Sequence, residues 1–149
     1  MEHEIVLAHE FVEFIPDELK ERTLYVSQTY CTAVHKCCCG CGREVVTPLS
    51  PTGWQLTFDG KAVSLYPSIG SWSLPCQSHY FITNNKVIWA RKWTKKQIAR
   101  GRAREAKVRE RYYAETPPPA PSASPVLSAK ERVWKKIQKW FSSDQSEDR

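Results

Sequence analysis

The chain has 149 residues and a formal net charge of +6, a length that suits one domain with appendages. Residues 1–90 carry 6 lysines and arginines against 9 aspartates and glutamates, whereas residues 91–149 carry 16 against 7. No stretch approaches the roughly 18 apolar residues of a membrane span, and the first 30 residues lack the features of a signal peptide. We therefore expect a cytoplasmic protein whose acidic first part and basic second part do different work.

The first 90 residues predict a small, mostly antiparallel β domain, because short β-rich runs alternate with turn residues. The pairs Asp59-Gly60 and Asn84-Asn85 each separate two such runs and indicate two-residue hairpins, since both turn positions need positive φ. A domain of this size has a modest core, so a bound metal would help to keep it folded. The expected strands cover residues 23–27, 32–35, 54–58, 62–66, 80–82 and 87–89.

The second part predicts helices around a linker, which makes the chain α+β overall. Thr94 and Gln97 are spaced as in a capping box and open a basic helix. A proline-rich linker separates it from an amphipathic helix that either docks on protein, the use we favour, or lies on an anionic membrane surface. The expected segments are 1–93 for the zinc-binding β domain, 94–114 for the basic helix, 115–127 for the Pro/Ala/Ser linker, 128–142 for the amphipathic helix and 143–149 for a disordered tail.

Four of the six cysteines lie within residues 37–41, and glycines at 40 and 42 let this segment turn tightly. In a cytoplasmic protein, clustered cysteines indicate a metal site more often than disulfides. Tetrahedral zinc holds its sulfurs roughly 4 Å apart, whereas alternate residues of a strand lie about 6.6 Å apart, so the segment must bend sharply. We predict one zinc ion in a structural site. Its expected ligands are Cys37, Cys39, Cys41 and the distant Cys76.

Three further residues near this site have their own interpretations. Cys38 is expected to point away from the ion, although its spacing from Cys41 also fits a zinc knuckle. His79 is either free or joins Cys76 as a ligand pair, and the second arrangement can leave an open position for water. Cys31 is expected to be a strand core residue.

A free His79 predicts acyl-transfer chemistry with a serine. Residues 65–72 place proline, glycine and serine between large apolar residues, as in a bend that presents backbone amides and a hydroxyl. Ser68 is the first choice of nucleophile, because Pro67 fixes the backbone before it. The histidine would take the hydroxyl proton and the amides would stabilise an oxyanion. Ser78 is less suitable, because neighbouring strand residues face opposite ways.

A dense and ordered set of motifs runs through the first 90 residues: Cys37–Pro51, Trp54, Phe58–Gly60, Ser64–Gly70, Cys76–Tyr80 and Trp89-Ala90. Over roughly residues 9–113, the chain resembles a bacterial family of formerly unknown function. Its members are encoded beside ubiquitin-like proteins and their activating-like and conjugating-like enzymes, in Bub-type ubiquitination-like operons. The resemblance implies a role in such a pathway, and makes the chain a candidate for the peptidase that trims the modifier or removes it from targets. It also implies that position 38 need not be cysteine.

The leading hypothesis is therefore a hydrolase that cleaves at the C-terminal tail of a ubiquitin-like protein, by serine and histidine acyl transfer on a structural-zinc scaffold. One alternative is a zinc metallopeptidase with the same substrate. Another is a non-catalytic zinc adaptor for the conjugation enzymes. Nucleic-acid binding by the basic helix is not favoured, because the metal-bearing domain is acidic. The expected partners are the ubiquitin-like protein and its conjugation enzymes.

Overall fold

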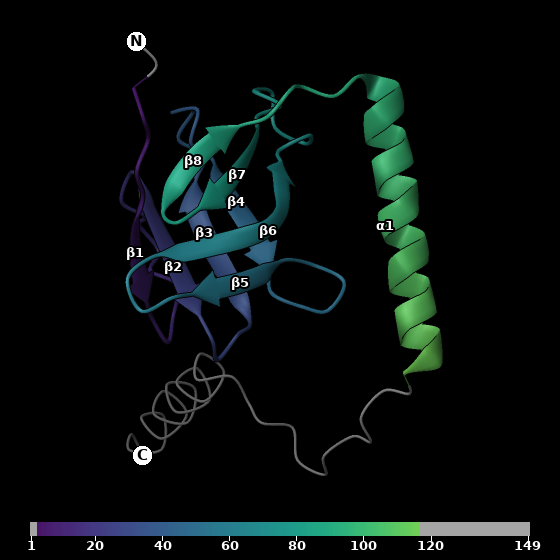
Figure 1. Ribbon diagram of the computed structural model, residues 1–149, viewed down its shortest axis with the longest axis horizontal. Coiled ribbons are helices and arrows are strands. Elements are labelled where there is room, and N and C mark those ends of the chain that lie inside the picture. The colour runs from purple at the N-terminus through teal and green to yellow at the C-terminus, as the bar shows by residue number, and fades with distance from the viewer. Residues whose placement is uncertain (1–2, 117–149) are drawn as a thin grey trace, which may run out of the picture. The chain divides into compact units, whose positions relative to one another are not determined.

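The computed structural model describes residues 3–116, which form eight strands in two four-stranded sheets followed by one helix (Figure 1). Within each sheet the strands follow their order in the chain, and all neighbours pair antiparallel except β1 and β2, which are parallel. The mainly β fold predicted from the sequence is thus confirmed. The strands are β1 (Ala8–Phe11), β2 (Thr23–Ser27), β3 (Thr32–Lys36), β4 (Glu44–Pro48), β5 (Gln55–Phe58), β6 (Val63–Gly70), β7 (His79–Thr83) and β8 (Lys86–Trp89).

The two sheets pack face to face, with β5 and β6 crossing in front of the first sheet in Figure 1. Leu24 and Val26 of β2 lie in one buried cluster with Leu65 of β6 and Ile82 of β7. Residues that alternate along a strand share a face, so these side chains project from the two sheets into one core. This packing positions β6 and β7, which carry Ser68 and His79.

One polar contact crosses the core. The imidazole Nε2 of His35, on β3, lies 2.7 Å from the hydroxyl oxygen of Tyr80, on β7, and both residues are fully buried. Burial lowers the pKa of His35 to about 4 and raises the pKa of Tyr80, so both side chains are neutral at pH 7. The hydrogen bond satisfies two groups that would be costly to bury alone.

The two predicted hairpins have different outcomes. Asn84 and Asn85 join β7 to β8 with φ values of 50° and 64°, which confirms the two-residue turn. The prediction of a two-residue turn at Asp59-Gly60 is wrong, because β5 ends at Phe58 and β6 begins at Val63. The Asp59 carboxylate accepts hydrogen bonds of 2.8 Å from the backbone amides of residues 61 and 62, which stabilises a four-residue loop.

Other local expectations also need correction. β1 and β4 were not predicted from the sequence, and β6 continues to Gly70 through the segment expected to be a bend. Cys31 is not a core residue: it is exposed, with a φ of 48°, in the turn between β2 and β3. Its amide donates to the carbonyl of Gln28, so the chain is already turning before β3 begins.

The helix α1 (Lys95–Glu115) begins with the expected capping box. The Thr94 amide donates to the Gln97 side-chain oxygen at 2.8 Å, and the Gln97 amide donates to the Thr94 hydroxyl at 3.3 Å. Only Ile98 and Gly101 of this helix are buried. Within residues 3–116, no helix combines the length and apolar character needed to cross a membrane. Most of the expected linker, the 128–142 helix and the 143–149 tail lie outside the described residues.

The contact between His35 and Tyr80 predicts a measurable effect on stability. Tyr80→Phe should lower the free energy of unfolding by about 1–3 kcal/mol, because it leaves a buried imidazole nitrogen without a partner. Urea denaturation of the purified variant measures this change. Tyr66→Phe is the control, since the Tyr66 side chain is 68% exposed and should show no change. An unaltered unfolding midpoint in Tyr80→Phe would contradict the prediction.

Candidate active site and metal centre

Four cysteine side chains converge where a loop of the first sheet meets a loop of the second sheet. The segment between β3 and β4 supplies three of them, and the loop between β6 and β7 supplies Cys76. Gly40 and Gly42, with φ values of 87° and 75°, allow the sharp bend that the sequence analysis required. The four Sγ atoms all lie within 4.8 Å of one another. The cluster comprises Cys37, Cys39, Cys41 and Cys76, the four ligands expected from the sequence.

The spacing of these thiols fits a metal ion. The Sγ atom of Cys37 lies 3.4 Å from that of Cys39 and 3.8 Å from that of Cys76, and the Sγ atoms of Cys41 and Cys76 are 4.0 Å apart. Sulfurs bound to one tetrahedral ion are separated by similar distances. The cluster could therefore hold a metal ion in an all-thiolate site.

The pKa values of the thiols differ because their surroundings differ. Burial raises the pKa of Cys37 to about 12. Burial also opposes ionisation of Cys39, but hydrogen bonds from the Ser78 hydroxyl and the Cys41 amide outweigh it and lower the pKa of that thiol to about 6. A cation bound among the four sulfurs would favour the thiolate form of each, since opposite charge stabilises the ionised group.

Cys38 and His79 both lie outside this cluster. Cys38 packs against the hydrophobic core, and burial raises its pKa to about 11. His79 uses both ring nitrogens elsewhere: Nδ1 lies 2.7 Å from the backbone carbonyl oxygen of Arg91, and Nε2 lies 2.9 Å from Oγ of Ser68. The described residues therefore place His79 with Ser68 and not with Cys76.

The two contacts of His79 fix its tautomer. A carbonyl oxygen can only accept a hydrogen bond, so Nδ1 carries the proton and donates it to Arg91. Nε2 is then the acceptor, and the Ser68 hydroxyl donates to it. This is the arrangement in which an imidazole can remove a proton from a serine. The sequence offered no signal for the role of Arg91, because a backbone carbonyl is present at every position.

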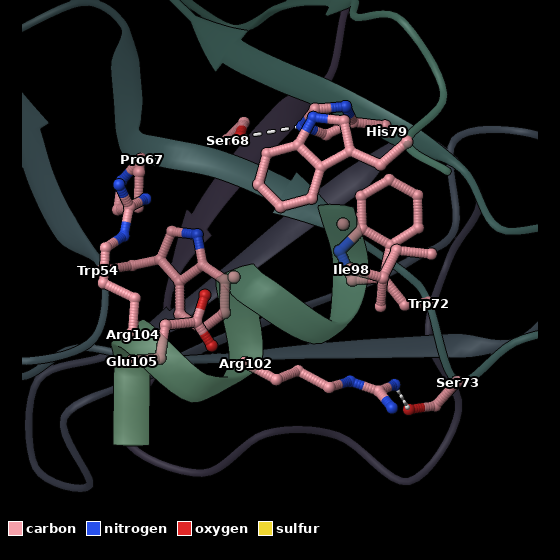
Figure 2. A pocket seen from close by; sticks show the side chains of 13 residues that line it. Trp54, Pro67, Ser68, Trp72, Ser73, His79, Ile98, Arg102, Arg104 and Glu105 are labelled. Atoms are coloured by element: carbon pink, nitrogen blue, oxygen red, sulfur yellow. Dashed lines mark hydrogen bonds between the residues drawn. The ribbon is translucent and has the colours of Figure 1, made fainter. Parts of the chain in front are cut away.

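Ser68 owes its position to an irregularity in β6. Leu65 is paired with Ile82 of β7, but Ile69 is paired with Tyr80, so β6 contains two more residues than β7 over this stretch. The extra residues form a bulge, which redirects side chains and interrupts strand pairing. Ser68 has no register partner on β5 or β7 and reaches His79, the first residue of β7 (Figure 2).

Two tryptophans enclose the imidazole of His79. The rings of Trp72 and Trp93 stack on each other, with centroids 5.5 Å apart, and their centroids lie 5.0 Å and 5.3 Å from that of His79. Gly70 makes room for this packing, because a Cβ atom there would lie 2.3 Å from the Trp72 ring. The aromatic rings limit rotation of the imidazole and exclude water from one side of it. Neither tryptophan was identified from the sequence as part of the site.

Two cavities meet at Ser68. The first, of about 260 Å³, also contains His79 and both stacked tryptophans, and the second, of about 470 Å³, extends toward Tyr113. Both cavities are lined by Trp54, Pro67, Ser68 and Glu105. Figure 2 shows the first cavity, with side chains of α1 facing those of the β domain.

The cysteine cluster predicts that the purified protein contains about one metal ion per chain. Cys76→Ser should reduce the metal content strongly, because it removes one of four thiolates and the only one from the second sheet. Cys31→Ser is the matched control, since Cys31 is exposed and outside the cluster. Native mass spectrometry measures the bound metal. Equal metal contents in the two variants, or none in the wild type, would contradict the prediction.

Comparison with known proteins identifies a family. A model of the family "Bacterial ubiquitination-like system serine protease (BubE)" matches residues 11–90. That range contains the four clustered cysteines, Ser68 and His79, and it ends before Arg91 and α1. No curated protein and no solved structure matches the chain. The family match covers more than half of the sequence, and the chain therefore belongs to the BubE family of bacterial ubiquitination-like system serine proteases.

Proposed function

We propose that the protein is a serine peptidase in which Ser68 is the nucleophile and His79 the general base. The observation that supports this most directly is the 2.9 Å contact from His79 Nε2 to the Ser68 hydroxyl, with Nδ1 anchored on the Arg91 carbonyl. The family description names serine proteases, which agrees with this assignment. The Arg91 carbonyl takes the orienting place that a carboxylate holds in a Ser-His-Asp triad.

The proposed reaction proceeds through an acyl-enzyme. Ser68 Oγ attacks the carbonyl carbon of the substrate while its proton passes to His79 Nε2. His79 then gives this proton to the leaving nitrogen or oxygen. In the second step His79 Nε2 removes a proton from water, which attacks the acyl-enzyme and releases the acyl group, and the proton returns to Ser68. The backbone amide of Ser68 is a candidate oxyanion donor, because the bulge leaves Ser68 without a register partner.

We propose as substrate the C-terminal tail of a ubiquitin-like protein, joined to its extension or target by an amide or ester bond. The basis is the family description, which places these proteases in a bacterial ubiquitination-like system. A flexible tail suits the site, because the cavities on both sides of Ser68 can receive an extended chain.

We further propose that the cysteine cluster binds zinc in a structural role. Four cysteine ligands close the tetrahedron and leave no position for water or substrate. Bound zinc would hold the β6–β7 loop against the β3–β4 segment, and thereby support β7 at His79. A metallopeptidase mechanism would need an open position, which four thiolates do not offer.

Substitution of Ser68 tests the mechanism. Ser68→Ala should reduce cleavage of a purified ubiquitin-like substrate of the same system by about 1,000-fold or more, because no other group supplies the nucleophile. Fluorophosphonate labelling, detected by mass spectrometry, should occur on Ser68 and disappear in the variant. Ser73→Ala, which changes another serine of the same cavity, should still be labelled. Cleavage that survives in Ser68→Ala but stops with a chelator would indicate a metallopeptidase instead. Binding without cleavage would indicate an adaptor.

A further inference from the structure

The helix α1 stands over Ser68 with a face that the β domain does not cover. Ile98 and Gly101 anchor its first turns, and Gly101 fits against Trp93, where a Cβ atom would lie 2.7 Å from the ring. From Arg102 to Arg111 every residue of the helix is exposed. Yet this part of the helix lines both cavities that meet at Ser68. The helix is therefore fixed at one end and forms the wall of an open groove at the other.

The groove face of α1 is charged, and Arg102 donates a hydrogen bond of 3.5 Å to the Ser73 hydroxyl of the β domain (Figure 2). Arg102 and Arg104 line the first cavity, Arg109 lines the second, and Glu105 lines both. Among residues 3–116, none of the ion pairs involves α1. The β-domain side of the two cavities offers tryptophan, proline, serine, threonine, glycine and the imidazole of His79 but no carboxylate. Guanidinium groups that face an uncharged wall across a groove are suited to carboxylates brought by a ligand.

We propose that α1 selects substrates by charge, with Arg102 and Arg109 binding acidic side chains on opposite sides of the cleaved bond. This inference rests on the proposed peptidase function of Ser68. The two arginines are separated by about 10 Å along the helix axis, at 1.5 Å per residue, which corresponds to about three residues of an extended peptide. Glu105, which lies between them in the helix and lines both cavities together with Ser68, repels an acidic side chain at the cleaved bond itself. The preferred substrate is an extended peptide with acidic residues flanking a non-acidic cleavage point.

Cleavage of a peptide library by the full chain, read by mass spectrometry, tests this pattern. Aspartate and glutamate should be enriched within about three residues on each side of the cleaved bond and depleted at the bond. Glu105→Gln should remove the depletion. A wild-type profile without flanking acidic residues, or with basic ones, would overturn the proposal.

A matched pair of double variants separates the groove from overall charge. In Arg102→Gln/Arg109→Gln, kcat/KM for an acidic-flanked peptide should fall about tenfold, with no change for a neutral peptide. Lys96→Gln/Lys107→Gln removes the same charge from the opposite face of the helix, by its 100° turn per residue, and neither lysine lines the two cavities. This control should keep the acidic preference. An equal loss in both double variants would overturn the proposal.

Fluorophosphonate labelling distinguishes failure of this inference from failure of the peptidase assignment. The probe reports Ser68 reactivity and carries no acidic peptide, so Glu105→Gln and both double variants should label like the wild type. Labelled Ser68 without acidic preference would overturn charge selection by α1 alone. Absence of labelling in the wild type would overturn the peptidase function and this inference with it.

Discussion

The convergence of Cys76 on the β3–β4 segment is the constraint on which the site depends. A β domain of about 90 residues has a small core, and its two sheets are also joined by hydrophobic packing and by the contact between His35 and Tyr80. The cysteine cluster adds a contact between the two sheets, and its member Cys76 lies three residues before His79 in the chain. The same loop that carries Cys76 thus leads directly into the strand whose first side chain contacts Ser68.

The cysteine thiols and the imidazole of His79 have separate contacts, although Cys76 and His79 are only three residues apart in the chain. The four thiols lie close to one another, whereas the two ring nitrogens of His79 contact Arg91 and Ser68. Trp72 and Trp93 cover the imidazole and leave the serine facing the cavities. In the proposed mechanism, every proton movement is assigned to Ser68 and His79.

Local sequence signals predicted the turn and the helix start that are stabilised by residues close together in the chain. Asn84-Asn85 formed its hairpin because asparagine tolerates positive φ at low cost, and the hydrogen bonds of Thr94 and Gln97 satisfy the helix start without help from the fold. Asp59 shows the limit of such signals, since its carboxylate stabilised a longer loop than its pairing with glycine indicated.

Features decided by distant contacts could not be predicted in this way. β1 pairs in parallel with β2, which requires a connection whose path no short motif specifies. Ser68 and the four clustered cysteines were chosen from residue chemistry and spacing, and their approach in space was only an expectation. The groove residues of α1 were beyond reach, because the sequence shows basic residues around the whole helix and only tertiary packing selects which face lies over Ser68.

The Arg91 carbonyl has an unusual genetic consequence. An acidic side chain that orients a catalytic histidine can be lost by one codon change, but a main-chain oxygen persists through any substitution at its own position. Replacing Arg91 by alanine would keep this carbonyl oxygen, so alanine scanning would not reveal the role of residue 91. The vulnerable property is the course of the chain around residue 91. An insertion, a deletion or a proline there would displace the carbonyl oxygen, whereas a change of the Arg91 side chain alone would leave it in place.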